Sequence, residues 1–575
     1  MCGFIAIAGE QLNITNYDTD SMLRKLEKRG PDGFGEALFS NCWLGHRRLA
    51  IVDLENGEQP MADGHLSISF NGEIYNNLEL RIKLKKGGVV FNTESDTETI
   101  LKAYHVWGNN CVKYLDGIFA FVIWDDFKNE MFVARDRLGQ KPFYYFFDNK
   151  KILMASEIKS LIASNAVKPQ LDYCSIDNYL RLMYIPPWKS VYKNIFQVPP
   201  AHCGIFKNGT LLLKRYWSLK HKSINISYDE AKNEVRRLLI NAVRKRLGNS
   251  DVEIGVFLSG GVDSSLVALI ANKDLGYPLK AFSVSYTGHD ELFFAKQVGK
   301  KINAKHFVSK IDKCLINEVK RVIYYFDEPH ADTSDFPQHI ISGLASKKVK
   351  VVLSGDGADE LFLGYKWHAK MSDELLYNRL NFICPFTFDE RVALWGSDNF
   401  INNNILTKEV FYNLKDQIDC VTMFDITSHL PGQILTKIDR AGMMHGLEVR
   451  SPFLDIDLLE FVFNLPYEYK ISNGEQKHLL KDILSEYMPD TFARRRKQGF
   501  GAPINKWLHD PQIKNYVFKR LRTGQLKPMF SLKVINNYLD DFYEKRERPE
   551  RASQKIWVLL CLELWLSQLN NTYEK

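Results

Sequence analysis

The chain has 575 residues, of which 45% are hydrophobic and 25% charged, and its formal net charge is +7. A chain of this length exceeds what one hydrophobic core can organise, so we expect two domains. The hydrophobic content excludes a disordered protein. Because the charge is spread over 76 basic and 69 acidic residues, the composition gives no sign of a concentrated nucleic-acid-binding face.

The cysteines and the apolar runs narrow the class further. Nine cysteines without a CxxC pair favour neither a disulfide framework nor a structural zinc site. The first ten residues lack the features of a signal peptide, and no run of about 18 apolar residues occurs. We therefore expect a cytoplasmic protein with neither a membrane nor a nucleic acid as partner. The basic run at 494–497 indicates a solvated turn more than an anion-binding edge.

The first 205 residues are dominated by short apolar runs that Gly, Asn and Asp interrupt. Such runs predict strands joined by turns. The clearest are GFIAIAG (3–9), LSISFNGEIYN (66–76), IFAFVIWDD (118–126) and MFVARD (131–136). A proline-rich passage and a polar stretch follow, so we expect a first domain at 1–205 and a linker at 206–228.

From residue 229 onward, amphipathic helical patterns alternate with buried strand patterns. The expected helices are 229–247, 264–273 and 291–302, and the expected strands are 252–258, 279–286 and 349–355. This alternation is typical of βαβ units with a parallel sheet, because such strands are covered on both faces. We expect an α/β domain at 229–575, whose last helices, in 511–575, close the α/β core.

Cys2 directly follows Met1, and removal of that methionine would leave a free α-amine beside the thiol. An α-amine has a pKa near about 8, so it can accept the thiol proton. Six segments resemble, in order, the class II glutamine amidotransferase domain, which is an N-terminal-nucleophile hydrolase with an α+β sandwich. They are RGPDGFG (29–35), GHRRLAIVD (45–53), NGEIYN (71–76), SDTE (95–98), LDGIFAFVIWD (115–125) and RDRLGQKPFYY (135–145).

This resemblance implies roles for five residues around the Cys2 nucleophile. The Asn71 side-chain amide and the Gly72 backbone N–H would form an oxyanion hole. The alternative for this Asn-Gly pair is an ordinary hairpin turn. Arg48 would bind the α-carboxylate of glutamine, and Asp96, assisted by Glu73, would bind its α-amine.

The segment SGGVDSS (259–265) lies between an expected strand and an expected helix. Glycines, serine hydroxyls and a helix N-terminus make a phosphate cradle. The lysine of a Walker A loop is missing. The segment resembles the PP-loop of ATP pyrophosphatases, which implies that ATP transfers AMP to a carboxylate and that Asp263 holds Mg²⁺. A simple Ser-Gly turn before a helix is the alternative.

Further segments resemble the synthetase domain of glutamine-dependent asparagine synthetases over about 230–510. They are FSVSY (282–286), FDEPHADTSDFP (326–337), LSGDGADELFLGY (353–365), TKIDRAGMMHGLEVRSPFLD (436–455) and RKQGFGAPINKWL (496–508). The resemblance implies an ATP site formed by Leu258, Ser259, Gly260, Gly261, Asp263, Ser264, Ser265, Val284, Ser354 and Gly355.

The same resemblance implies further roles in the chemistry of the second domain. Asp359 would be a second Mg²⁺ carboxylate beside Asp263. Tyr365 and Lys477 would surround the acyl-adenylate, and Lys477 would stabilise its charge. Asp356 would take a proton from the attacking ammonia, although some family members have a glutamate there.

Together these resemblances imply an enzyme that hydrolyses glutamine at Cys2 and passes ammonia through an intramolecular tunnel to a β-aspartyl-AMP made from aspartate and ATP. The acceptor stays open, because Gly442 replaces the usual serine of DRASM and Leu363 interrupts the usual glycine pair. A sugar-nucleotide uronic acid is the alternative acceptor. A tRNA-modifying PP-loop protein and a regulatory protein with inactive sites are more distant alternatives. Assembly as a homodimer also stays open.

Overall fold

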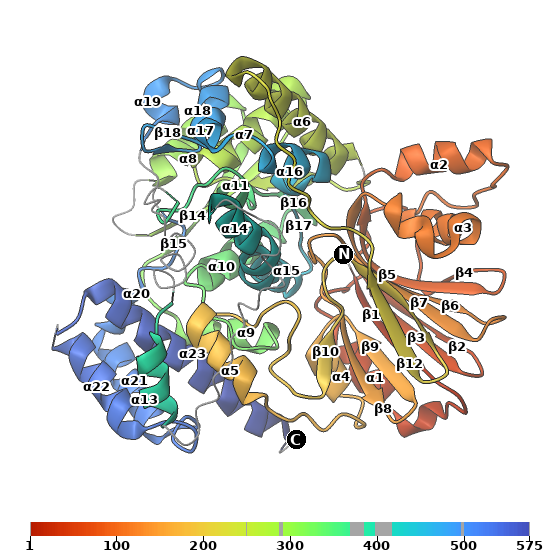
Figure 1. Ribbon diagram of the computed structural model, residues 1–575, viewed down its shortest axis with the longest axis horizontal. Helices are drawn as coiled ribbons and strands as arrows, with labels where there is room; N and C mark the ends of the chain where they lie inside the picture. Colours follow the sequence, from red (N-terminus) through yellow and green to blue (C-terminus); the bar gives the residue numbers. More distant parts are fainter. Residues whose placement is uncertain are drawn as a thin grey trace.

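The computed structural model describes residues 2–248, 250–286, 291–368, 384–396, 417–495, 499–544 and 546–573. Figure 1 shows two halves: a strand-rich half in red to yellow, and a half in green to blue in which helices surround a smaller sheet. This order of an α+β sandwich followed by an α/β domain confirms the predicted fold class.

The first sheet of the strand-rich half is antiparallel and has the order β10-β8-β9-β1-β3-β2. All six residues of its inner strand β1 are buried, and this strand confirms the first predicted apolar run. The bounds are β1 (Gly3–Ala8), β2 (Gly33–Leu38), β3 (Cys42–Arg48), β8 (Tyr144–Asp148), β9 (Lys151–Ala155) and β10 (Ile195–Gln197).

The second sheet is also antiparallel, has the order β12-β11-β7-β6-β5-β4 and packs on the first. Side chains of β6 alternate between its two faces, as the period of a strand requires. Phe119 and Phe121 pack with helices α2 and α3, whereas Ala120 and Val122 pack with the first sheet. The bounds are β4 (Met61–Asp63), β5 (Leu66–Ile74), β6 (Gly117–Asp125), β7 (Glu130–Arg135), β11 (His202–Lys207), β12 (Thr210–Arg215), α2 (Asn77–Lys86) and α3 (Asp96–Trp107).

The expected linker at 206–228 contains regular structure. Strand β12 pairs with β11, from His202↔Arg215 to Lys207↔Thr210, so the second sheet continues beyond residue 205. The strand gives only a weak signal in the sequence, because β12 lies at the sheet edge and its three consecutive leucines do not alternate with polar residues. We therefore propose that the first domain ends after Arg215 and that the connection is 216–227.

The second half is built on a parallel sheet of order β15-β14-β13-β16-β17, as predicted. Helices cover it on both sides, which explains why its strands read as continuous apolar runs. Its strands are β13 (Ile254–Phe257), β14 (Lys280–Tyr286), β15 (Lys305–Ile311), β16 (Val351–Leu353) and β17 (Glu448–Arg450), and its main helices are α6 (Tyr228–Gly248), α7 (Val262–Leu269), α8 (Glu291–Lys301), α9 (Ile316–Tyr325), α10 (Asp335–Ala345), α11 (Ala358–Leu361), α16 (Ile456–Phe463) and α18 (His478–Ser485).

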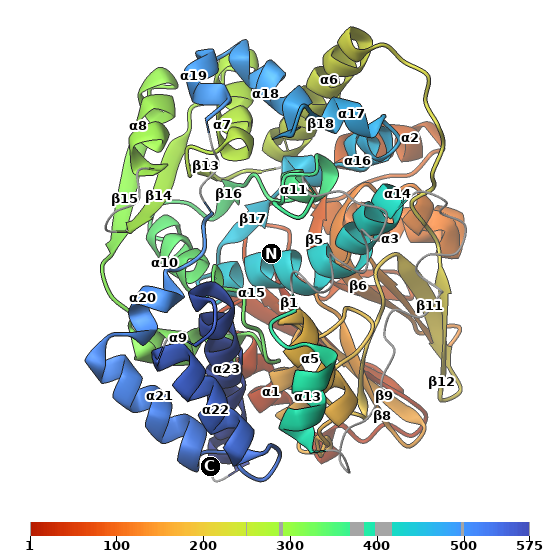
Figure 2. The same cartoon turned by 60° about the vertical axis from the view of Figure 1, so that its left-hand side comes forward.

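Helix α15 (Thr436–Met443) lies where the two halves meet, and β1 begins beside it in both views (Figures 1 and 2). It follows a π-helical segment, Asp425–Leu435, that contains Pro431. All residues of α15 except Thr436 are buried. This helix is therefore in a position to contact both halves at once.

The C-terminal helices pack against both halves. Helices α20 (Ile504–Leu508), α21 (Pro511–Thr523), α22 (Leu532–Tyr543) and α23 (Pro549–Tyr573) lie outside the main core around the parallel sheet, but their cluster reaches Tyr286 of β14 and Ile311 of β15. They belong to a second cluster that includes Ile5 and Tyr179 of the first half, and the Tyr179 hydroxyl donates to the Val558 carbonyl at 2.8 Å. These helices therefore bridge the halves. None of the helices in the described part of the chain combines the length and apolar character that a membrane span requires.

Candidate functional site

The first candidate site surrounds Cys2, which is buried at the start of β1. Its backbone N–H donates to Asn71 Oδ1 at 3.0 Å, so the structure brings together two residues that lie 69 positions apart. The other end of this amide, Asn71 Nδ2, is buried and has no hydrogen-bond partner within the described residues. Leaving a buried donor unsatisfied costs about 1–3 kcal/mol. A donor in this state next to a thiol is what an oxyanion hole requires.

Gly72 lies inside strand β5, opposite Phe119 of β6. The alternative of a hairpin turn at Asn71-Gly72 is therefore wrong. A Cβ atom at Gly72 would lie 2.0 Å from the Ile118 carbonyl oxygen and 2.7 Å from the Phe119 Cα. Glycine is needed here because the two backbones approach closely.

The Cys2 thiol has a pKa above its usual range, because burial disfavours the thiolate. The Leu49 backbone N–H and the nearby Arg48 guanidinium offset part of this effect. A thiol with a raised pKa does not ionise by itself at neutral pH. The site therefore needs a base for the Cys2 proton.

The residues predicted to hold glutamine lie around the same strands. Arg48 ends β3 and donates to the carbonyls of Val52, at 3.3 Å, and Leu54, at 3.2 Å. Asp96 begins α3, and its Oδ2 accepts the Ile74 N–H at 3.0 Å. Burial raises the pKa of Asp96 to about 6.

Glu73 connects this site to the other half of the molecule. Its Oε2 accepts from Arg450 Nη2 at 3.0 Å, and Arg450 also donates to Glu448 Oε1 at 2.5 Å. Burial, with neighbouring Asp96, raises the pKa of Glu73 well above its usual range, although Arg450 opposes the shift. Glu448 and Arg450 both lie on β17, within the segment 436–455, but the sequence had assigned neither of them a role.

Arg29 makes a second connection from Cys2 to the other half. Its Nε donates to the Cys2 carbonyl at 3.1 Å, and its Nη1 and Nη2 donate to Asp439 at 2.7 and 3.0 Å. Asp439 lies on α15, so the pair crosses the junction between the halves. Although burial alone would raise it, Arg29 and Lys141 lower the pKa of Asp439 to about 2. The sequence placed Arg29 in a recognised segment but gave no sign of its partner.

The second candidate site begins at the loop 259–265. Gly260 has a φ of +79°, and Gly261 caps α7. The Ser259 and Ser264 hydroxyls lie 3.0 Å apart, whereas the buried Ser265 Oγ has no hydrogen-bond partner among the described residues. The loop therefore presents backbone N–H groups and a spare hydroxyl at a helix N-terminus, which suits a phosphate.

Two other predicted ATP-site segments lie beside this loop. A Cβ atom on Gly355 would lie 2.8 Å from Asp263 Cβ and from the Ser264 backbone N, so Gly355 permits close contact. The preceding Ser354 Oγ lies 2.8 Å from Ser451 Oγ. Leu258 donates its backbone N–H to Phe282 of β14 at 2.8 Å, and Val284 lies farther along that strand.

Asp356 follows Gly355, and burial raises its pKa, which Lys437 and the Ser354 side chain partly oppose. Lys437 lies on α15, and its Nζ donates to Ser334 Oγ at 2.9 Å and lies 3.4 Å from Asp332 Oδ2. Lys437 had no predicted role, although it belongs to a recognised segment. Since Asp439 lies on the same helix, α15 carries groups that interact with both candidate sites.

Lys477 lies between the two carboxylates predicted to hold Mg²⁺. Its Nζ is 2.7 Å from both oxygens of Asp263 and 2.7 Å from Asp359 Oδ1. Within the described residues, no group of three or more His, Cys, Asp or Glu side chains is arranged to hold a metal ion. Two converging carboxylates fit Mg²⁺ nevertheless, because this ion commonly uses one or two of them together with substrate phosphates. The ammonium nitrogen marks where a cation can stand.

Tyr365 and the two departures from the family pattern complete the site. The Tyr365 hydroxyl donates to Glu360 Oε1 at 2.5 Å, and its ring stacks on Trp367 with centroids 4.2 Å apart. Leu363 adopts a left-handed φ of +54°, which a glycine would adopt without strain. A Cβ atom on Gly442 would lie 2.7 Å from the Leu447 carbonyl oxygen, so a serine would not fit without a shift.

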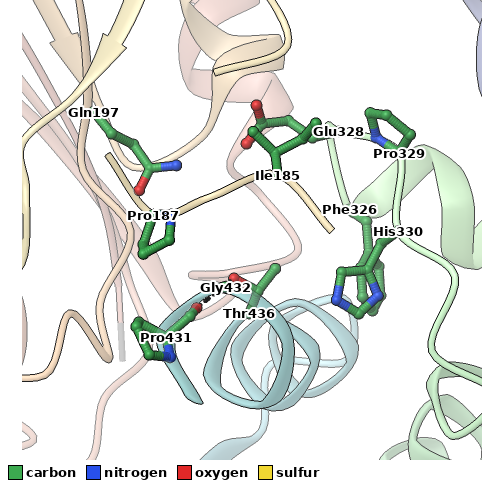
Figure 3. Close-up of a pocket in the computed structure, with 10 residues that line it drawn as sticks. All are labelled: Ile185, Pro187, Gln197, Phe326, Glu328, Pro329, His330, Pro431, Gly432 and Thr436. Carbon is green, nitrogen blue, oxygen red and sulfur yellow. Dashed lines mark hydrogen bonds between the residues drawn. The ribbon is translucent and has the colours of Figure 1, made fainter. Parts of the chain in front are cut away.

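A small cavity lies between the halves (Figure 3). Glu328 lines it; its carboxylate accepts from the Val191 N–H and the Tyr144 hydroxyl, and burial raises its pKa to about 7. Neither Cys2 nor Asp356 lines the cavity, so it is part of the junction and of neither candidate site. Its walls are Ile185, Pro187 and Gln197 of the first half and Phe326, Glu328, Pro329, His330, Pro431, Gly432 and Thr436 of the second.

Fold and site geometry define a class of protein: a buried cysteine at position 2 in an α+β sandwich, joined to an α/β domain that carries a PP-loop. The glutamine amidotransferase domain family matches residues 1–217, and the asparagine synthase family matches residues 234–567. The chain belongs to the asparagine synthase family.

Similar full-length proteins agree with this assignment. Asparagine synthetase [glutamine-hydrolyzing] 1 of Bacillus subtilis is 30% identical over 99% of this chain and 96% of its own length. Asparagine synthetase [glutamine-hydrolyzing] 3 of the same species is 31% identical over 91% of this chain and 90% of its own. A probable asparagine synthetase [glutamine-hydrolyzing] of Schizosaccharomyces pombe is 29% identical over 88% and 86%. The predicted family and enzyme class are confirmed; the roles of individual site residues stay predictions.

Proposed function

We propose that the chain hydrolyses glutamine at Cys2 and uses the ammonia, with ATP and Mg²⁺, to convert aspartate to asparagine, with glutamate, AMP and pyrophosphate as the other products. The observation that carries this proposal is the buried amide of Asn71, bonded to the Cys2 backbone at one end and unpartnered at the other. Family membership and the names of the relatives support the synthetase half.

In the first half, the α-amine that removal of Met1 exposes takes the Cys2 proton; Met1 itself lies outside the described residues. The thiolate attacks the glutamine amide, and Asn71 Nδ2 and the Gly72 N–H stabilise the oxyanion. Arg48 binds the α-carboxylate, and Asp96 with Glu73 binds the α-amine. Collapse of the tetrahedral species releases ammonia, and water then frees glutamate from Cys2.

In the second half, the loop at 259–265 holds the ATP phosphates while Val284 and the Leu258 backbone contact the nucleoside. Asp263 and Asp359 would hold Mg²⁺, which would neutralise charge on the departing pyrophosphate. The aspartate side-chain carboxylate attacks the α-phosphorus, giving an acyl-adenylate near Ser354, Gly355 and Tyr365. Asp356 then accepts a proton from the attacking ammonia, and AMP leaves.

The junction supports passage of ammonia between the sites. Helix α15 carries Asp439, which is tied to Cys2 through Arg29, and Lys437, which faces Asp356. Neutral ammonia needs shelter from water, and the burial of α15 between the two sites supports such a route. We also expect a cytoplasmic protein that acts on small molecules, and a homodimer stays possible only as a prediction.

The acceptor is tested by ATP-dependent pyrophosphate release. We expect release with aspartate and glutamine, and none when a sugar-nucleotide uronic acid replaces aspartate. Because only the glutaminase needs the thiol, Cys2→Ala should abolish glutamine-dependent synthesis and leave ammonium-dependent synthesis intact. Turnover with the uronic acid and none with aspartate would favour the alternative acceptor; loss of both nitrogen sources in C2A would give Cys2 a structural role.

A further inference from the structure

The side-chain ammonium group of Lys477 lies between the carboxylates of Asp263 and Asp359. Asp263 is the second residue of α7 and Asp359 the second of α11, and both point their carboxylates at Lys477 Nζ. Lys477 is only 4% exposed, and its two partners raise its pKa against the effect of burial. The Lys477 nitrogen lies 2.7 Å from oxygens of both carboxylates and therefore occupies the space between them.

The surrounding backbone holds Lys477 in this place. Lys477 has a left-handed φ of +55° just before α18, and its carbonyl accepts the Lys481 N–H at 2.9 Å. Gly364 closes the opposite wall, since a Cβ atom there would lie 2.0 Å from Lys477 Cε and 2.1 Å from Asp359 Oδ1. An ammonium and a metal ion cannot occupy this space together.

A divalent ion that arrives alone would have to displace the buried ammonium, which would then lose both carboxylates. The displaced Lys477 ammonium group could move toward the phosphate loop at 259–265, because Asp263 is part of that loop and Ser264 and Ser265 follow directly. Phosphates bound at this loop would give the Lys477 ammonium new anionic partners within reach of its own side chain. Binding of the nucleotide phosphates and binding of the divalent ion would therefore each strengthen the other.

We propose that Lys477 is the resident cation of the Asp263–Asp359 pair and sets the order of binding: it yields its place to a divalent ion only when nucleotide phosphates receive its ammonium group. The inference rests on the proposed ATP site, but not on which carboxylate the enzyme amidates. It gives Lys477 a role before any chemistry, in addition to its predicted role near the acyl-adenylate.

The test measures binding of Mn²⁺ to the full-length protein, with and without the non-cleavable nucleotide α,β-methylene-ATP. In the wild type we expect Mn²⁺ alone to bind weakly and to bind at least tenfold more tightly with the nucleotide. In Lys477→Met, we expect Mn²⁺ alone to bind at least tenfold more tightly than in the wild type, because the carboxylates have lost their own cation. The nucleotide should then strengthen Mn²⁺ binding much less. A purely structural lysine would not produce a gain of binding.

Three further variants make the test specific. Lys481→Met removes a lysine four residues along α18 that pairs with Glu475, and should leave Mn²⁺ binding unchanged. Asp263→Asn added to K477M should remove the gain. Lys477→Gln keeps donors for the carboxylates and serves if K477M does not fold, which circular dichroism would reveal.

The outcomes separate this inference from the proposed function. No gain in either Lys477 variant, while the nucleotide still binds, would overturn the exchange alone. Equal Mn²⁺ affinity of the wild type with and without nucleotide would overturn it as well. Failure of the wild type to bind the nucleotide with Mn²⁺ would overturn both this inference and the ATP site.

Discussion

The two candidate sites differ in how they stand before substrate arrives. Beside Cys2, the Asn71 amide nitrogen is buried with no partner in the described structure, so a donor is already in place for a charge that exists only during reaction. At the second site, Lys477 already neutralises the carboxylates of Asp263 and Asp359. A transient oxyanion rewards donors fixed in advance. ATP phosphates and their metal ion carry permanent charges. A site for them is more stable if its own carboxylates are paired with a cation until the phosphates and the metal ion bind.

The largest expected effect tests the readiness of the first site. Asn71→Ala removes the waiting donor, so kcat for glutamine hydrolysis should fall about 10²–10³-fold, as for other oxyanion-hole donors. Ammonium-dependent synthesis should not change, since that reaction bypasses Cys2. Steady-state release of glutamate and of pyrophosphate measures the two halves separately.

Asn76 supplies the matched control for this variant. It belongs to the same recognised segment, and both ends of its amide are bonded: Nδ2 donates to the Tyr114 carbonyl and Oδ1 accepts the Asp116 N–H. Asn76→Ala should leave kcat for glutamine within a few fold of the wild type. An equal loss in both variants would mean that the strand, and not the donor, had been damaged.

A smaller effect is expected where the two sites are joined. Asp439→Asn leaves the buried Arg29 with Glu157, at 3.0 Å, as its one carboxylate partner among the described residues. Removing one member of a buried ion pair costs about 3–5 kcal/mol, so we expect a loss of about 3 kcal/mol in the free energy of unfolding. Because Arg29 also holds the Cys2 carbonyl, glutamine-dependent turnover should fall more than ammonium-dependent turnover.

Denaturant unfolding and the two activity assays measure these effects. Asp457→Asn is the control, because Asp457 has a side chain that is 69% exposed and forms a surface pair with Lys245. That variant should change stability by less than about 1 kcal/mol. If D439N lowered both activities equally, the link through Arg29 would not serve the glutaminase site in particular.

The sequence predicted the elements that depend on local pattern. Strand β1, strands β5 to β7 and the parallel strands β13, β14 and β16 lie where apolar runs indicated them. It did not predict β12, whose alternation of exposed and half-buried residues is weak on a sheet edge. The Asn71-Gly72 pair alone indicates a turn, and only the flanking segments favoured a role in the site; the pairing of β5 with β6 overrides the turn signal.

The parts of the sites that could not be predicted are pairs of residues far apart in the chain. Arg29 and Asp439 are separated by 410 positions, and Lys477 and Asp263 by 214. Arg29, Asp439 and Asp263 lay in recognised segments and Lys477 was predicted as a single position, but neither kind of signal names a partner. A buried charge requires a counter-charge, yet only the packing of the two halves decides which one it meets.

The smallest expected effect is a pH dependence of the glutamine site. Burial raises the pKa of Asp96 to about 6, so this carboxyl is ionised above pH 6 and neutral below it. Only the ionised form attracts the glutamine ammonium group. Therefore kcat/KM for glutamine, which reports the free enzyme, should fall up to about tenfold per pH unit as the pH drops below about 6. Ammonium-dependent synthesis, measured against aspartate, should lack this limb.

Two variants assign the limb to its residue. Asp96→Asn should have a low kcat/KM for glutamine at every pH and no limb near 6. Glu73→Gln should keep the limb near pH 6, because Asp96 remains and burial is the main cause of its raised pKa. A limb near 4 in the wild type, or a limb near 6 that persists in D96N, would show that Asp96 is not the group that titrates. The carboxyl that binds the glutamine ammonium group would then not be Asp96. The proposed difference between the two sites before substrate binds would lose this part of its support.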